Sequence, residues 1–235
     1  STNADLVAAA GATAAGTVLF AERQRAARGR LERGWVSPAR AGLTFSALLR
    51  PRAPRTTWGW LTLLAGVATR DAVAAMTGLP AALKWPNDLL IGSDGRKAAG
   101  ILAQVAGDAV VVGIGVNVTT TAAELALPGA TSLAGAGAER VDRTELAIRL
   151  LAALGERYRA WEAARGDAVA AGLAGAYRAH CATIGAPVRV VATVGGELVG
   201  LAIGVDDSGQ LLVRADGRTR AIAAGDVYHV RPATG

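Results

Sequence analysis

The pattern of the sequence changes between residues 183 and 187. Before this interval, stretches with helical spacing alternate with apolar runs of strand length, whereas only short β runs follow it. Turn pairs such as Gly195-Gly196 and Asp216-Gly217 separate these short runs, and such pairs are typical of tight turns between antiparallel strands. We therefore expect a mixed α+β body over residues 1–183 and a small all-β barrel over residues 184–235.

The body contains two clearly marked helices. Apolar residues recur at helical spacing from Thr56 to Met76, and Gly78 follows as a stop signal. Asp142, with Glu145 three residues later, resembles a capping box at the start of a helix that reaches about Ala164. Further helices are expected at 5–15 and 167–181, and strands at 17–22, 43–49, 82–90, 99–105 and 109–118. The last of these strands is nearly all apolar, which predicts burial on both faces.

Composition narrows the class of protein. With 51% hydrophobic and 19% charged residues, the chain is too apolar to be disordered and long enough to bury a core. A lone Cys181 cannot form an internal disulfide, which favours a reducing compartment and hence the cytoplasm. No apolar run reaches the roughly 18 residues that a membrane span requires, so no membrane partner is expected.

Almost all of the basic residues are arginines. Of the 25 basic residues only Lys84 and Lys97 are lysines, and the rest are arginines. A compact ammonium and a planar guanidinium interact differently, so the two lysines are candidates for positions where arginine does not serve. The net charge of +6 suits nucleic acid, an acidic partner or a polyphosphate, and does not choose among them.

Several common catalytic motifs are absent. The sequence has no phosphate-binding P-loop and no G-x-S-x-G nucleophile motif, and the glycines at 113 and 115 lack the third glycine of a dinucleotide fingerprint. His180 and His229 lie far apart without carboxylates or cysteines at ligand spacing, so a zinc site is not expected. His180 and Cys181 are neighbours on an expected helix and would point apart, which argues against a Cys-His dyad.

Two clusters remain as candidates for chemistry. The first is a basic glycine-containing loop from Arg28 to Trp35, which offers backbone amides and guanidinium groups to an anion and an indole ring to a base. It is consistent with binding of nucleic acid or nucleotide, and also with a solvated surface loop.

The second cluster is Lys84-Trp85-Pro86-Asn87-Asp88, followed by Lys97. Its amide and carboxylate, close to lysine, could hold a hydrated magnesium ion and the phosphates that accompany it. The alternative is that Trp85 and Pro86 pack in the core while Asp88 starts a turn.

Taken together and in this order, these segments closely resemble those of biotin protein ligases, the enzymes that attach biotin to carboxylases. The resemblance covers nearly the whole chain. It rests on Ser1-Thr2-Asn3, Gln24, Arg28-Gly29-Arg30 with Trp35, Lys84-Trp85-Pro86-Asn87-Asp88, Lys97 with Gly100-Ile101-Leu102, Gly113 with Gly115-Val116-Asn117, and the small C-terminal barrel. Lipoate ligases are similar in architecture, but their arginine–serine–glycine-rich and His-Asp signature is absent here.

The resemblance implies a catalytic domain like that of class II aminoacyl-tRNA synthetases, with a mixed β-sheet and flanking helices, and an SH3-like C-terminal barrel. It also implies that biotin reacts with ATP, aided by Mg²⁺, to give biotinyl-AMP, and that a lysine of a biotin carboxyl carrier protein domain then takes the biotinyl group. Some similar ligases carry an upstream winged-helix repressor domain. No such segment stands before Ser1, so DNA is not an expected partner.

The resemblance also implies roles for individual residues. Ser1, Thr2 and Gln24 match positions that hydrogen-bond the ureido ring of biotin, with Asn3, Gly100 and Gly115 also in the biotin site. Arg28, Arg30 and Lys97 match the catalytic groups, of which the two arginines close over the biotin carboxylate and the phosphate. Lys97 neutralises charge as these two anions approach. The residues assigned to the ATP-binding site are Arg30, Trp35, Lys84, Asn87, Lys97 and Asn117. Those assigned to the metal site are Asn87 and, more weakly, Asp88.

The sequence departs from the family pattern in four places. Ala27 stands where a glycine usually opens the loop, Arg25 replaces a small or polar residue, Glu32 replaces a frequent glycine, and residues 92–95 lengthen the turn before Lys97. We expect Ala27 to weaken biotin binding, because its methyl group is costly if the backbone there needs a positive φ. The alternative function is a nucleic-acid-binding module that uses the arginine-rich loop and the C-terminal barrel.

Overall fold

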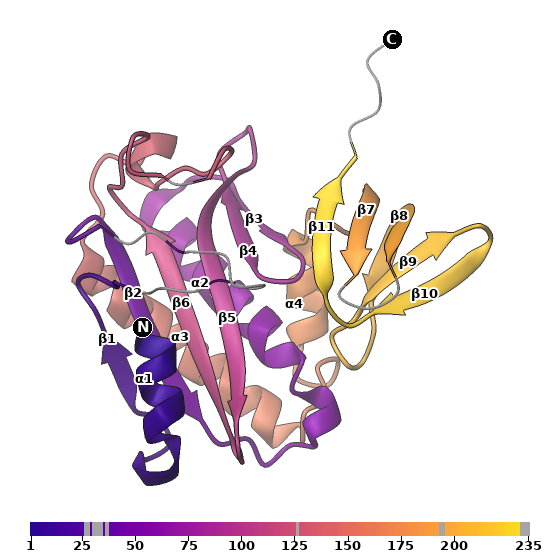
Figure 1. Ribbon diagram of the computed structural model, residues 1–235, viewed down its shortest axis with the longest axis horizontal. Coiled ribbons are helices and arrows are strands. Elements are labelled where there is room, and N and C mark those ends of the chain that lie inside the picture. Colours follow the sequence, from indigo (N-terminus) through magenta and orange to yellow (C-terminus); the bar gives the residue numbers. More distant parts are fainter. Residues whose placement is uncertain (26–28, 30–34, 36–37, 126, 193–195, 231–235) are drawn as a thin grey trace.

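The computed structural model describes residues 1–25, 29, 35, 38–125, 127–192 and 196–230. The body is built on a six-stranded sheet in the order β1-β2-β6-β5-β4-β3 (Figure 1). Its strands are β1 (Val18–Phe20), β2 (Gly42–Leu49), β3 (Ala81–Lys84), β4 (Asp88–Ile91), β5 (Arg96–Ala106) and β6 (Ala109–Asn117). All its neighbouring strands are antiparallel, so the sheet is not mixed. Short turns join β3 to β6 in succession, and such turns place consecutive strands antiparallel.

Helices cover both faces of this sheet. They are α1 (Thr2–Ala9), α2 (Trp60–Thr77), α3 (Arg143–Ala163) and α4 (Leu173–His180), with short 3₁₀ helices η1 (Ala10–Ala12), η3 (Arg55–Thr57) and η4 (Ala134–Ala136). The main core lies between the sheet and α2, α3 and α4, whereas a small cluster around Leu6 and Leu48 joins α1 to the other face (Figure 1). Strand β6 is buried along almost its whole length, which confirms that both of its faces are covered.

The C-terminal part is a five-stranded antiparallel sheet in the order β10-β9-β8-β7-β11. Its strands are β7 (Pro187–Ala192), β8 (Glu197–Val205), β9 (Leu211–Ala215), β10 (Arg218–Ile222) and β11 (Gly225–His229). The fold class of an α+β body with a C-terminal β domain is therefore confirmed. Closure of this sheet into an SH3-like barrel stays a prediction, as does the division of the chain into domains at residues 183 and 184.

The two parts are packed closely together. The indole nitrogens of Trp60 and Trp85 donate hydrogen bonds to the carbonyl oxygens of Asp207 and Gly209, at 2.9 and 3.1 Å. At Gly59, just before α2, a Cβ atom would lie only 2.3 Å from the Ser208 carbonyl oxygen. Only glycine allows this close approach, which holds the C-terminal sheet beside the turn between β3 and β4.

Three expected elements are wrong in detail. The strand expected at 82–90 is two strands, β3 and β4, because Pro86 cannot donate to a sheet ladder and the chain turns there through a cis Trp85–Pro86 bond. The helix expected at 167–181 begins only at Leu173, after Gly172 with φ of +71°. The first helix starts at Thr2 rather than at residue 5, and its α-helical part ends at Ala9.

The expected N-terminus of the long helix is confirmed. A side-chain oxygen of Asp142 accepts hydrogen bonds from the backbone N–H groups of Thr144 and Glu145. These bonds lower the pKa of the Asp142 carboxyl below its usual value. Glu145 forms an ion pair with Arg149 one turn further on. Within the described ranges, no helix is long and apolar enough to cross a membrane.

Candidate functional site

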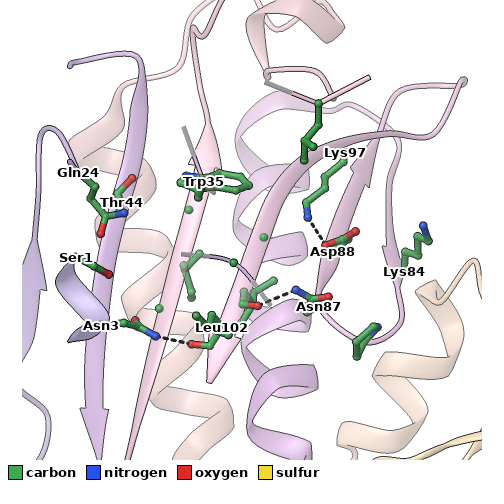
Figure 2. A pocket seen from close by; sticks show the side chains of 18 of the residues that line it. Ser1, Asn3, Gln24, Trp35, Thr44, Lys84, Asn87, Asp88, Lys97 and Leu102 are labelled. Atoms are coloured by element: carbon green, nitrogen blue, oxygen red, sulfur yellow. Dashed lines mark hydrogen bonds and ion pairs between the residues drawn. The ribbon is translucent and has the colours of Figure 1, made fainter. Parts of the chain in front are cut away.

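A cavity opens on the α1 side of the six-stranded sheet (Figure 2). Most of the residues that the sequence suggested for binding or catalysis line it, although they come from six separate segments of the chain. They are Ser1, Thr2, Asn3, Gln24, Trp35, Lys84, Asn87, Asp88, Lys97, Gly100 and Gly115. The sequence therefore predicted that these segments meet at one place.

The floor of the cavity is formed by two rows of residues that run across the sheet. One row is Thr44, Gly115, Gly100 and Asp88, and the next is Gly113 and Leu102, each residue opposite the next on neighbouring strands; Ser46 continues the second row on β2 but does not line the cavity. The rows are two residues apart along the strands, so their side chains face the same side. A Cβ atom on Gly113 would lie 2.0 Å from Asn3 Oδ1, and one on Gly115 would lie 2.8 Å from the Trp35 ring. The glycines therefore make room for side chains above them.

A β-bulge brings Lys97 to this face. The pairing of β4 with β5 shifts between Leu89 and Leu90, so that Leu89 opposes Ala99 while Leu90 opposes Lys97. Without the extra residue, Lys97 would lie on the opposite face from Gly100, because their separation of three residues is odd. The ammonium group instead lies 3.5 Å from where a Cβ atom on Gly100 would stand. The backbone of Lys97 also bonds to the segment at 129–131.

Lys97 and Asp88 form an ion pair at the charged end of the cavity. The distance from Nζ to Oδ1 is 2.6 Å, and the side chains are 24% and 18% exposed (Figure 2). The Lys97 ammonium also lies 5.8 Å from the centre of the Trp35 ring, within the range of a cation–π contact. The only two lysines of the chain thus both line the cavity, since Lys84 opposes Asp88 across the β3–β4 hairpin.

Asn87 closes the turn between β3 and β4. Its side-chain amide nitrogen donates to the Ile101 carbonyl oxygen at 3.0 Å, and its own carbonyl oxygen accepts from the Ile101 amide at 2.9 Å. On this turn the cavity is lined by the carboxylate of Asp88 and the side-chain amide of Asn87, which lie next to each other in the chain. Magnesium commonly takes one or two protein oxygens and completes its shell with water and phosphate, so this donor set fits the ion.

Hydrogen bonds link the other end of the cavity to α1. Gln24 Oε1 accepts from the Thr2 backbone N–H at 2.9 Å and lies 3.3 Å from the Thr2 hydroxyl. Ser46 Oγ lies 2.8 Å from Thr2 Oγ1 and 2.6 Å from Asn3 Oδ1. The Asn3 side-chain nitrogen donates to the Leu102 carbonyl oxygen at 3.1 Å (Figure 2). The side chains at this end are therefore uncharged and rich in hydrogen-bonding groups.

The structure places one assigned residue elsewhere. Asn117 is not among the described residues that line the cavity, and its side-chain nitrogen donates to the Thr131 carbonyl oxygen at 3.0 Å. Its assignment to ATP stays a prediction. Arg28 and Arg30 lie outside the described residues, as do Ala27 and Glu32. Arg25 is described and exposed.

The sequence left open whether the C-terminal barrel helps to hold ATP or the acceptor domain, and it singled out no residue of the C-terminal sheet for the site. Asp226, Val227 and Tyr228 of β11 line the cavity opposite the body. The Thr183 hydroxyl accepts from the backbone N–H of Trp85 at 3.0 Å and lies 3.1 Å from His229 Nε2, which ties β11 to the β3–β4 turn. Partial burial, followed by the charge of Lys84, lowers the pKa of His229 below its ordinary value.

Comparison with known proteins gives consistent matches along the chain. Residues 6–119 match the model of the Biotin/lipoate A/B protein ligase family, and residues 183–230 match the Biotin protein ligase C terminal domain. The biotin--[acetyl-CoA-carboxylase] ligase of Mycobacterium tuberculosis is 46% identical over 98% of this chain and 86% of that protein. The bifunctional ligase/repressor BirA of Bacillus spizizenii is 33% identical over 90% of this chain and 66% of that protein.

A solved structure agrees with these matches. The biotin protein ligase from Aquifex aeolicus, in complex with biotin and ATP, has a TM-score of 0.82 and 27% identity, over 99% of this chain and 95% of that chain. The fold is thus that of the enzymes that ligate biotin or lipoate to proteins. Within that class, the chain belongs to the biotin protein ligase family and is an ATP-dependent biotin ligase.

Proposed function

We propose that the cavity binds biotin with its ureido ring at the uncharged α1 end and its carboxylate at the charged end beside Lys97. The single observation that carries this assignment is that both ends lie on one face of one sheet. From β2 to β5 is two strand spacings, about 9.5 Å. This is close to the extended length of a bicyclic ring with a five-carbon acid chain.

At the uncharged end, Thr2 and Gln24 provide the contacts to the ureido group, with Ser1 and Asn3 around them. A urea carries two N–H donors and a carbonyl acceptor, and each group left unpaired on burial costs about 1–3 kcal/mol. Hydroxyl and amide side chains at this end can pair with all of these groups. The apolar ring and chain then lie along the row of Gly113, Gly115 and Gly100, in the space beside the Asn3 and Trp35 side chains that lie against these glycines.

At the charged end, Lys97 lowers the repulsion between the biotin carboxylate and the phosphates of ATP. A carboxylate oxygen attacks the α-phosphorus, the bond from that phosphorus to the bridging oxygen breaks, and pyrophosphate leaves with the electron pair. A fixed cation at this point is worth about 10²–10³ in rate, by analogy with a single oxyanion-hole donor. Asp88 holds the ammonium of Lys97 at this position, and Lys84 and Trp35 flank the nucleotide.

Asn87 and Asp88 would hold Mg²⁺, which when bound supplies positive charge to the triphosphate. Arg28 and Arg30 keep the role that the family resemblance implies, closing over the two anions.

In the second step, a lysine amine of the acceptor attacks the acyl carbon of biotinyl-AMP, and AMP leaves. The acceptor we propose is the carrier domain of a biotin-dependent carboxylase, since the Mycobacterium tuberculosis relative is named for acetyl-CoA carboxylase.

Biotin-dependent exchange of pyrophosphate into ATP tests this proposal directly. The exchange needs only the first step, so no acceptor protein is required. We expect exchange with biotin and none without it. A folded protein that shows no biotin-dependent exchange would contradict the proposal.

A further inference from the structure

Beneath the uncharged end of the cavity lies a buried chain of hydrogen bonds in which Ser46 is central. Ser46 is fully buried on β2, and Thr2 and Asn3 are 5% and 6% exposed. Its hydroxyl oxygen lies 2.8 Å from Thr2 Oγ1 and 2.6 Å from Asn3 Oδ1. Ser46 does not line the cavity itself. The donor and acceptor in each of these hydrogen bonds follow from neighbouring backbone groups, since a carbonyl oxygen can only accept and an N–H can only donate.

The first fixed group is the Leu102 carbonyl oxygen, which can only accept. It lies 3.1 Å from the Asn3 side chain, so the atom of Asn3 that faces it must be the nitrogen. The same nitrogen donates to Gln104 Oε1 at 2.8 Å. The other amide atom, Oδ1, therefore faces Ser46, and an amide oxygen can only accept. The single proton of the Ser46 hydroxyl must go to Asn3 Oδ1.

This result fixes the Thr2 hydroxyl as well. Ser46 has no second proton, so the contact of 2.8 Å requires that Thr2 donates to Ser46. The lone pairs of Thr2 Oγ1 are then left to accept a proton from a ligand. Gln24 is fixed by the Thr2 backbone N–H, which donates to Oε1 at 2.9 Å and leaves the Gln24 side-chain NH₂ to donate.

We propose that Ser46 is a positioning residue. It accepts the proton of the Thr2 hydroxyl and thereby determines which arrangement of donors and acceptors in a ligand the biotin site can bind. The site then presents an acceptor, Thr2 Oγ1, next to a donor, the NH₂ of Gln24. This pair is complementary to an N–H and a C=O of a cyclic urea. The inference rests on the proposed placement of biotin and adds the reason for its selectivity.

The test compares Ser46→Ala with the wild-type enzyme in pyrophosphate exchange. In Ser46→Ala the Thr2 hydroxyl can turn its proton toward Gln24 Oε1, 3.3 Å away, or toward the ligand. We expect the KM for biotin to rise about tenfold, the size of one buried hydrogen bond to an uncharged group, with kcat within about twofold. Ser46→Thr keeps the hydroxyl and is expected to restore most of the binding.

Selectivity provides a measurement that a general loss of stability does not change. The probes are biotin and its two lactam analogues, in each of which one ureido N–H is replaced by CH₂. The wild type is expected to disfavour the analogue that lacks the N–H facing Thr2 by about tenfold or more, and Ser46→Ala is expected to lose most of that preference.

The matched control is Ser132→Ala. Ser132 is also buried, and its hydroxyl oxygen accepts from the Gly135 backbone N–H at 3.1 Å, away from the cavity. This control is expected to keep both the KM and the selectivity of the wild type. If Ser46→Ala does not fold, Ser46→Cys provides the same comparison, because a thiol fills the space but is a weak hydrogen-bonding group.

Unchanged KM and unchanged selectivity in folded Ser46→Ala or Ser46→Cys would overturn the role of Ser46. So would equal effects in Ser46→Ala and Ser132→Ala. Failure of the proposed function gives a different result, since wild-type protein would then show no biotin-dependent exchange at all.

Discussion

Removing the ammonium of Lys97 tests the charged end of the cavity. The group lies 2.6 Å from Asp88 Oδ1, and both side chains are mostly buried. In Lys97→Ala the reaction loses a fixed cation, which costs about 10²–10³ in kcat. It also gains an unpaired carboxylate beside the substrate anions. Two unit charges about 5 Å apart repel by about 3 kcal/mol at an effective dielectric constant of about 20.

The lost cation and the added repulsion together predict a loss of about 10⁴–10⁵ in adenylation for Lys97→Ala. The double variant Lys97→Ala/Asp88→Asn also lacks the cation, but it no longer has the repulsive Asp88 carboxylate. It should therefore be faster than Lys97→Ala alone. Asp88→Asn by itself should be slower than the wild type, because Lys97 loses the partner that holds it. The sign of this coupling separates two roles of Asp88, since a carboxylate that acted mainly as a metal ligand would make the double variant slower still.

The assay is single-turnover formation of biotinyl-AMP, followed separately by transfer from synthetic biotinyl-AMP to a carrier domain. Lys97 acts on the approach of two anions, so the first measurement should fall much further than the second. Thermal unfolding shows whether each variant is folded. A kcat for adenylation near the wild-type value in folded Lys97→Ala would refute the reasoning, and a double variant slower than Lys97→Ala would refute the role given to Asp88.

Two further predictions concern stability. Gly59→Ala should lower the free energy of unfolding, measured by urea titration, by about 1–3 kcal/mol, because its Cβ atom would lie 2.3 Å from the Ser208 carbonyl oxygen. The control is Gly11→Ala, whose Cβ atom would have no neighbouring atom within 4 Å. It should be neutral or slightly stabilising in the same titration. The lowered pKa of His229, caused by burial and then by Lys84, means that the unfolded chain binds more protons just below the ordinary histidine pKa. Stability should therefore fall as pH drops through about 6.5 toward the lower folded pKa. Unfolding of wild type and His229→Gln between pH 5 and 8 checks this, and an equal slope in both would contradict it.

Much of the site could be predicted because its segments carry unusual residues in a fixed order. Lys84 and Lys97 stand out among arginines, and the glycines at 100, 113 and 115 mark strands that something must approach closely. The expected meeting of these segments in one cavity is confirmed for the residues that the structure describes. Their roles toward biotin, ATP and magnesium remain proposals.

Other features depend on pairing between distant strands, which the local sequence does not specify. The bulge that turns Lys97 toward the cavity arises from the register of β4 against β5, and the residue types at 97 and 98 do not predict it. Ser46 lies in an apolar strand and was not a candidate, because its importance comes from contacts with residues more than 40 positions away. The part played by β11 depends likewise on how the C-terminal sheet packs against the body.

The sheet explains why an enzyme of this kind can combine an uncharged recognition site with a highly charged reaction site. Backbone ladder hydrogen bonds fix the spacing between β2, which carries Ser46 under the Thr2 end, and β5, which carries Lys97. Gly113, Gly115 and Gly100 add no side chains of their own between these ends, and in the proposed placement a ligand held at the Thr2 end has its acid near Lys97. In this placement, binding free energy gained at the ureido ring holds the carboxylate close to the ATP phosphates despite their electrostatic repulsion. We therefore expect selectivity for the urea and the rate of adenylation to be linked through the strand register of this sheet.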